Sequence, residues 1–110
     1  HLFVFPSEVE SFGLVYLEAA AAGLPIVARA GTGVVPELAE CGAAVLRIED
    51  SSTSAVSEAV ADCIGRYAML RADAVTAVPD VMARFSWEEH ARRWENFFSE
   101  CLQAQSSSSV

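Results

Sequence analysis

Three short apolar runs constrain the fold of this chain more than any other feature of its sequence. Residues 2–5 (LFVF), 26–29 (IVAR) and 44–48 (AVLRI) are rich in β-favouring side chains, and proline or glycine stands beside them. Helical stretches are predicted between and after these runs, at about 12–22, 35–40 and 52–66. Continuously apolar strands that alternate with helices are typical of a parallel sheet covered on both faces. The sequence therefore predicts an α/β fold, a Rossmann-like parallel sheet with flanking helices.

The second half of the chain is predicted to be helical. A stretch from about 66 to 83 reads as a helix that Pro79 interrupts. Ser86 followed three residues later by Glu89 has the sequence of a capping box, so a final helix is predicted to begin there. One face of this helix carries aromatic residues at helical spacing, which predicts core packing or docking against another domain: Trp87, Trp94 and Phe98. The serine-rich tail, residues 104–110, is predicted to be disordered.

The small size of the predicted sheet leads us to expect further strands from a longer protein. Three parallel strands leave sheet edges uncovered unless further strands come from elsewhere. The chain has 110 residues and opens at His1 directly before a predicted strand, and 53% of its residues are hydrophobic, a rich share. We therefore expect a piece of a longer protein whose other parts cover some of this apolar surface.

Composition and charge exclude several classes of function. The net charge is −8, and the seven basic residues are scattered arginines, so the clustered cations of a nucleic-acid-binding surface are absent from the sequence. No apolar run reaches the ~18–20 residues that span a bilayer, although this leaves membrane association of a longer protein open. Cys41, Cys63 and Cys101 include no C-x-x-C pair and are predicted to be reduced, buried thiols in a cytoplasmic protein. No metal site is predicted.

Two glutamates eight positions apart flank the start of the first predicted helix. Gly23 and Pro25 mark its end, so Glu10 lies in the loop before the helix and Glu18 in its second turn. The first amides of the helix, from Phe12 to Val15, lack intrahelical acceptors and lie after the carboxyl end of a strand, where open α/β sheets bind ligands. The neighbours of Glu18 are apolar, and a buried carboxylate needs hydrogen-bond donors such as vicinal sugar hydroxyls. The alternative is that both acids are ordinary capping or solvated surface residues.

The segment FPSEVESFGLVYLEAAAAGLPIVA resembles the donor-binding segment of retaining glycosyltransferases of family 4, which have the GT-B fold. Glu10 and Glu18 match the E-x7-E motif of that family. GTGVVPEL (31–38) is similar to the glycine-rich turn that follows, although Thr32 here separates two glycines that are often adjacent. FSWEEHARRW (85–94) is similar to the final helix, which crosses back towards the N-terminal domain.

The resemblance implies a division of the chain and a role for each site residue. Residues 1–84 would be part of a Rossmann-like nucleotide-sugar-binding domain, and 85–103 the crossing helix. Glu10 would contact the donor sugar, and Glu18 would bind the ribose hydroxyls. The diphosphate and sugar would meet backbone amides at the start of the helix: Phe12, Gly13, Leu14 and Val15. The implied partners are a nucleoside diphosphate sugar and an N-terminal acceptor domain of the same protein, and no cofactor is implied.

The predicted activity is transfer of a glycosyl group from a nucleoside diphosphate sugar to an acceptor, with retention of anomeric configuration. The sequence has no D-x-D pair, which fits metal-independent chemistry, and Glu10 is the candidate catalytic residue. The isolated chain is predicted to be inactive because half of the cleft is missing. The alternative is a non-catalytic nucleotide-sugar-binding module or pseudoenzyme subunit with the same fold. A sugar-nucleotide epimerase or phosphorylase is a third interpretation, which the E-x7-E segment disfavours. Arg29, Glu37 and His90 are interpreted as structural or solvated residues.

Overall fold

The computed structural model describes residues 1–8 and 12–108, with side chains to residue 106. Its elements follow the predicted order, with three strands, β1 (Phe3–Phe5), β2 (Ile26–Arg29) and β3 (Val45–Ile48). The first three helices are α1 (Leu14–Ala21), α2 (Val35–Glu40) and α3 (Thr53–Gly65). Two longer helices complete the chain, α4 (Tyr67–Arg84) and α5 (Trp87–Ser108).

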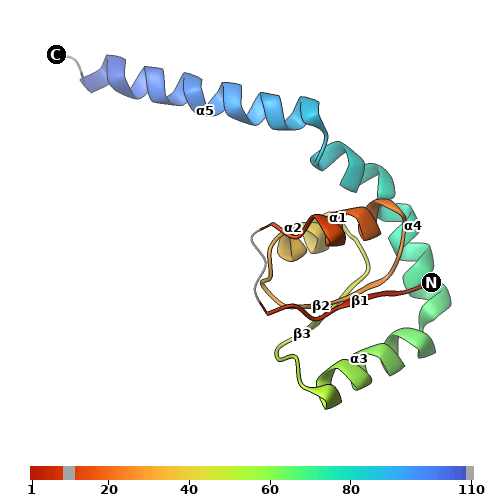
Figure 1. Ribbon diagram of the computed structural model, residues 1–110. Helices are drawn as coiled ribbons and strands as arrows, with labels where there is room; N and C mark the ends of the chain where they lie inside the picture. The colour runs from red at the N-terminus through yellow and green to blue at the C-terminus, as the bar shows by residue number, and fades with distance from the viewer. Residues whose placement is uncertain (9–11, 109–110) are drawn as a thin grey trace.

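The three strands form one parallel sheet in the order β1-β2-β3. Val27 of β2 lies opposite Val4 of β1 and Leu46 of β3. Helices α1 and α2 cover one face of this sheet and α3 covers the other, as Figure 1 shows. The middle strand β2 is apolar from Ile26 to Ala28 because it is covered on both faces of the sheet, where these three residues are fully buried.

Two apolar clusters lie on the two sides of the sheet. The larger joins β2 to one side of α1, to α2 and to the second half of α4, and it includes Tyr16, Leu38 and Val81. The smaller lies towards α3 and includes Cys63 and Leu70. Helix α4 contributes side chains to both clusters, so it packs along one edge of the layered unit (Figure 1). Helix α5 begins after it.

Hydroxyl or glycine caps lie at several element ends, and those predicted at Ser86 and Gly23 are confirmed. The Ser52 hydroxyl accepts a hydrogen bond from the Ala55 amide at the start of α3, and the Ser86 hydroxyl accepts one from the Glu89 amide at the start of α5. Gly23, with φ +70°, ends α1, and its amide donates to the carbonyl of Ala20.

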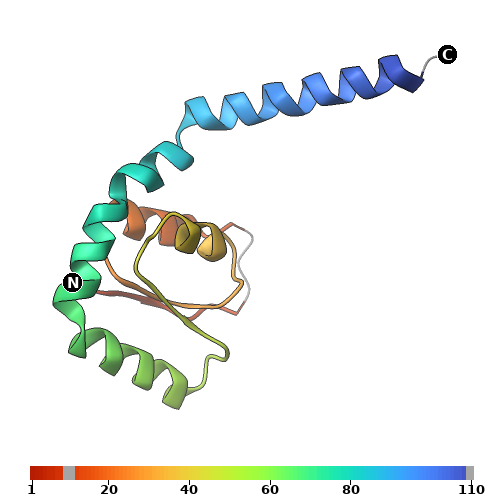
Figure 2. The ribbon, with the colours of Figure 1, turned by 180° about the vertical axis from the view of Figure 1, so that it is seen from behind.

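Three sequence predictions about the second half of the chain differ from the structure. Pro79 does not interrupt α4, which continues through it to Arg84. Helix α5 continues to Ser108 and so includes residues of the predicted tail 104–110, because Leu102, Gln103 and Ala104 are good helix formers that carry the helix onward. Cys101 is exposed rather than buried, since it lies on α5, which extends away from the sheet (Figure 2).

No helix in the described part of the chain is both long enough and apolar enough to cross a bilayer.

Candidate functional site

The start of α1 has an unusual backbone conformation. Gly13 is its N-cap residue and has φ +86° and ψ 54°, in the left-handed region. Its carbonyl accepts a hydrogen bond from the Tyr16 amide at 3.0 Å. A Cβ at this position would lie 2.5 Å from Cδ2 of Tyr16, so both the backbone torsion and the packing require glycine here. The turn therefore presents the first amides of α1 beside a residue that carries no side chain.

The predicted site residues that the structure describes lie together at this helix start. Leu14 is the first residue of α1, so the helix begins one or two residues later than predicted. The Phe12, Leu14 and Val15 side chains are 43%, 62% and 38% exposed. Glu10, the predicted catalytic residue, lies outside the described residues.

The Glu18 side chain is exposed, so the prediction that it is buried on an apolar face is wrong. Helix α1, LVYLEAAA, is apolar at every position but this one, and its buried side chains are Tyr16, Ala19 and Ala20. Glu18 therefore points away from the face that packs on the sheet. An exposed carboxylate near a helix start can accept hydrogen bonds from ligand hydroxyls without a prior cost of burial.

A second turn, Gly31–Val34, packs against the first. The Val34 amide donates to the Phe12 carbonyl at 2.7 Å. Gly33 has φ +49°, and a Cβ there would collide with that same carbonyl. Thr32, which separates the two glycines, is buried, and its carbonyl accepts from the Val35 amide as α2 begins. The starts of α1 and α2 are thus joined into one surface at the carboxyl end of the strands.

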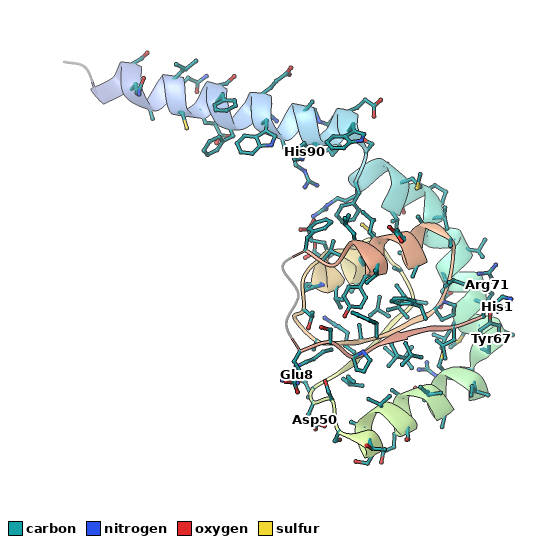
Figure 3. All side chains as sticks on the ribbon, viewed as in Figure 1. His1, Glu8, Asp50, Tyr67, Arg71 and His90 are labelled. Carbon is teal, nitrogen blue, oxygen red and sulfur yellow. The ribbon has the colours of Figure 1, made fainter. Side chains whose placement is uncertain are left out.

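Side chains from three other parts of the fold hold the chain where it leaves β1. The Tyr16 hydroxyl donates to the Phe5 carbonyl at 2.8 Å, and the Ser51 hydroxyl donates to the Pro6 carbonyl at 2.8 Å. Arg29 at the end of β2 lies 3.5 Å from the Glu8 carboxylate. Figure 3 shows Glu8 and Asp50 at this end of the sheet, with His1 and Tyr67 at the opposite end.

A cavity of about 460 Å³ lies beside the helix start. It is bounded by α1, α2 and the junction of α4 with α5, and its lining combines apolar and charged side chains: Phe12, Leu14, Leu17, Glu37, Arg84, Phe85, Ser86, Trp87, His90 and Arg93. The rings of Phe12 and Phe85, which both line it, meet edge to face with centroids 6.3 Å apart.

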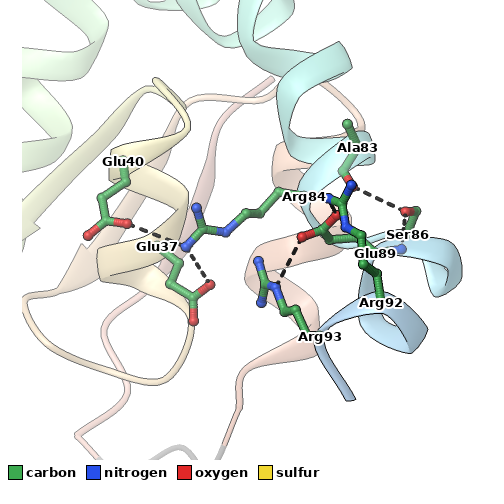
Figure 4. A network of polar contacts seen from close by, with 8 residues as sticks. All are labelled: Glu37, Glu40, Ala83, Arg84, Ser86, Glu89, Arg92 and Arg93. Atoms are coloured by element: carbon green, nitrogen blue, oxygen red, sulfur yellow. Dashed lines mark hydrogen bonds and ion pairs between the residues drawn. The ribbon is translucent and has the colours of Figure 1, made fainter. Parts of the chain in front are cut away.

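Arg84 connects the α4–α5 junction to α2, as Figure 4 shows. Its guanidinium lies 3.3 Å from the Glu37 carboxylate and 3.5 Å from that of Glu40. Glu89 of α5 contacts Arg92 and Arg93 of the same helix. The cations around the cavity are therefore already paired with carboxylates, which leaves little excess positive charge for an anionic ligand.

The Cys41 and Cys63 thiols are not activated as nucleophiles. Burial raises the pKa of the Cys41 thiol and of the Cys63 thiol, so both stay protonated and unreactive near neutral pH. Hydrogen bonds from Ser52 lower the pKa of the Asp50 carboxyl, which keeps it ionised. Among the residues that the structure describes, no group of three or more metal-ligating side chains is arranged to hold a metal ion.

Sequence reasoning missed the residues that support the site from a distance. Tyr16, Ser51 and Arg84 make their contacts with residues that lie 11, 45 and 47 positions away. Only Tyr16 carried a signal, since a tyrosine inside an otherwise small and aliphatic helix needs a partner for its hydroxyl when buried. His90, set aside in the sequence, is exposed and accepts a hydrogen bond from Trp94 on α5.

Two curated relatives match this chain, and both are synthases of sucrose or sucrose phosphate by name. In the curated relatives the chain resembles sucrose-phosphate synthase 4 of Arabidopsis thaliana, with 30% identity over 109 residues, which are 99% of this chain and 10% of the relative. It also resembles the sucrose synthase of Acidithiobacillus caldus, with 33% identity over 98 residues, 84% of this chain and 12% of the relative. The chain thus spans about a tenth of the length of these relatives.

A solved structure shares the fold. Sucrose-phosphate synthase from Thermosynechococcus elongatus superposes with a TM-score of 0.71 and 28% sequence identity, over 92% of this chain and 25% of that one. The predicted fold class, a Rossmann-like parallel sheet with flanking helices of the GT-B type, is confirmed. The family model described as glycosyl transferases group 1 matches residues 1–74, more than half of the chain and all of the sheet. The chain therefore belongs to the glycosyl transferases group 1 family.

Proposed function

We propose that this chain is the donor-binding part of a retaining glycosyltransferase of family 4, which transfers a sugar from a nucleoside diphosphate sugar to an acceptor. The observation that carries the proposal is the left-handed Gly13 turn: it opens the start of α1 at the carboxyl end of β1, within the stretch that matches the family. Relatives named sucrose synthase and sucrose-phosphate synthase support a sugar-transfer reaction of this kind.

The proposed donor site uses backbone and carboxylate groups. Amides from Phe12 to Val15, at the positive end of α1, receive the diphosphate and the sugar. Charge grows on the leaving diphosphate in the transition state, and amides already held in place stabilise it without reorganising. Glu10 contacts the sugar hydroxyls as a positioning and electrostatic group, and Glu18 accepts hydrogen bonds from the ribose. The exposure of Glu18 supports this role, because a ligand can reach its carboxylate.

We also propose that the division of the chain follows this function. Residues 1–84 form part of the nucleotide-sugar-binding domain, and 85–103 form a helix that meets an N-terminal acceptor domain of the same protein. Support comes from α5, whose apolar side chains are exposed: Trp87, Trp94, Phe97, Phe98 and Leu102. An amphipathic helix with an uncovered aromatic face is suited to docking against another surface.

The proposal is tested by an amide-resolved NMR titration of the full-length protein with UDP-, GDP- and ADP-glucose. We expect shifts concentrated at Phe12–Val15 and about 10- to 100-fold weaker binding in both Glu10→Gln and Glu18→Gln, because each loses a charge-assisted hydrogen bond. Glu58→Gln, an exposed glutamate of α3 away from this site, is the matched control and should bind like wild type.

A turnover assay with the same protein separates the enzyme from its alternative. Transfer of sugar to an acceptor supports the glycosyltransferase, whereas donor binding without transfer would favour a non-catalytic nucleotide-sugar-binding module. A folded full-length protein in which none of the three nucleotide sugars shifts these amides would rule out the donor site. Residues 1–110 alone are expected to show no turnover, and measurable transfer by them would contradict the proposed need for an acceptor domain.

A further inference from the structure

Tyr16 contacts both flanks of the loop between β1 and α1. It is fully buried, although it belongs to a helix whose other buried residues are alanines. Its hydroxyl donates to the carbonyl of Phe5, the last residue of β1, at 2.8 Å. Its ring lies against Gly13, where a Cβ would be only 2.5 Å away. One side chain therefore touches the residue before the loop and the residue that ends it.

The ring of Tyr16 is itself held by its neighbours. It meets Phe3 and Phe5 edge to face, with centroid separations of 6.1 and 5.7 Å. Such contacts fix the direction of an aromatic ring as well as burying it. The phenol oxygen is therefore held at the end of β1, and the ring edge at the start of α1, by packing on the side facing the sheet.

A phenylalanine at this position would keep the ring contacts but would lose the hydrogen bond to the Phe5 carbonyl. The Phe5 carbonyl closes the strand, and the next carbonyl, that of Pro6, takes its own hydrogen bond from Ser51 at 2.8 Å. Two successive carbonyls at the exit of β1 are thus bound by side-chain hydroxyls, one from α1 and one from the β3–α3 connection. Hydroxyl donors aimed at consecutive carbonyls fix the exit direction of the chain, which apolar packing alone does not.

We propose that Tyr16 is a positioning residue for the donor site: by tying the end of β1 to the Gly13 turn, it sets the orientation of the amides at the start of α1. This inference rests on the proposed function, since it assigns those amides to the donor. Tyr16 does not touch the ligand in this proposal and acts through Phe5 and Gly13. Ser51 supports the same exit from the side of the β3–α3 connection.

The test is the affinity of full-length Tyr16→Phe for the nucleotide sugar that the wild-type protein binds best among UDP-, GDP- and ADP-glucose. Removing the hydroxyl keeps the ring and should weaken binding about tenfold, as expected for the loss of one hydrogen bond that holds the binding amides in place. Ser51→Ala should weaken binding in the same direction. This variant loses the hydrogen bond to the Pro6 carbonyl without changing the apolar core. It therefore remains informative if Tyr16→Phe folds poorly.

Tyr67→Phe is the matched control. The Tyr67 hydroxyl also donates to a backbone carbonyl, that of His1, at 2.8 Å, but it lies at the opposite end of the sheet (Figure 3). A merely structural role for Tyr16 would lower the melting temperature and leave the Kd of the folded protein unchanged, which is the result expected for Tyr67→Phe. The amide shifts of Gly13–Val15 in the absence of ligand should change in Tyr16→Phe and not in Tyr67→Phe.

Two outcomes overturn the inference in distinguishable ways. If wild type binds and Tyr16→Phe binds equally well with unchanged Gly13–Val15 shifts, the positioning role is wrong while the donor site stands. If wild type binds none of the three nucleotide sugars, the donor site itself is rejected, and the role of Tyr16 is rejected with it.

Discussion

At the scale of single residues, Gly13 links the predicted chemistry to the fold. The resemblance implied that the Gly13 amide meets the donor, and the structure adds two reasons why this residue is a glycine. The residue adopts φ +86°, and its missing Cβ makes room for the Tyr16 ring. Gly42 has nearly the same torsion, φ +85°, but nothing lies within 4 Å of its would-be Cβ. Alanine substitution at the two positions would therefore separate the free-energy cost of backbone strain, which both share, from the cost of a steric collision, which only Gly13 has.

Gly13→Ala should destabilise the protein by about 2–5 kcal/mol, because a left-handed alanine costs ~1–2 kcal/mol and overpacking against Tyr16 adds ~1–3 kcal/mol. Gly42→Ala should cost only the first part, about 1–2 kcal/mol. Urea unfolding of the two variants measures both free energies. Equal losses would show that the ring of Tyr16 gives way freely, contrary to the packing described here.

At the scale of elements, what the sequence predicted well was local. Strand positions came from runs of β-favouring residues, and the start of α5 came from a capping-box sequence, because those signals act within four residues. The face of α1 that packs on the sheet could not be predicted. Nearly every residue of that helix is apolar, so periodicity is lost and Glu18 was wrongly expected to be buried. The contact of Arg84 with Glu37 joins positions too far apart for any local pattern.

Pro79 is the clearest test of element stability, since it is exposed inside α4 and lacks the amide that would bond to the preceding turn. Pro79→Ala should stabilise the protein by about 1–2 kcal/mol, less than the full ~3 kcal/mol helix penalty because the unfolded chain also gains freedom.

Pro36→Ala is the matched control, because Pro36 stands in the first turn of α2, where proline suits the helix. It should leave stability unchanged or lower it by up to about 1 kcal/mol. Thermal unfolding of both variants gives the comparison. A loss of stability in Pro79→Ala would mean that the proline shapes α4 for packing rather than weakening it.

At the scale of the whole molecule, α5 dominates the shape. The radius of gyration is 17.5 Å, and the extents are 62 × 28 × 16 Å. A compact chain of this length has a radius of gyration of about 13 Å. The excess comes from α5, which extends away from the layered unit (Figure 2).

Small-angle scattering of residues 1–110 should therefore give a radius of gyration near 17.5 Å. Removal of residues 87–110 should lower it to about 12 Å, the value for a compact unit of the remaining size. A value of about 13 Å for residues 1–110 would show that α5 folds back onto the sheet and buries its aromatic face.

The hydrogen bond from the Val34 amide to the Phe12 carbonyl has a consequence for engineering this scaffold. Because the two turns share that carbonyl and Gly33 leaves no room beside it, neither turn can be lengthened at this point without displacing the other. Grafted or randomised loops that aim to alter ligand choice should therefore avoid this pair of turns. Libraries built at Thr32–Val34 should be dominated by clones that lose both turns together.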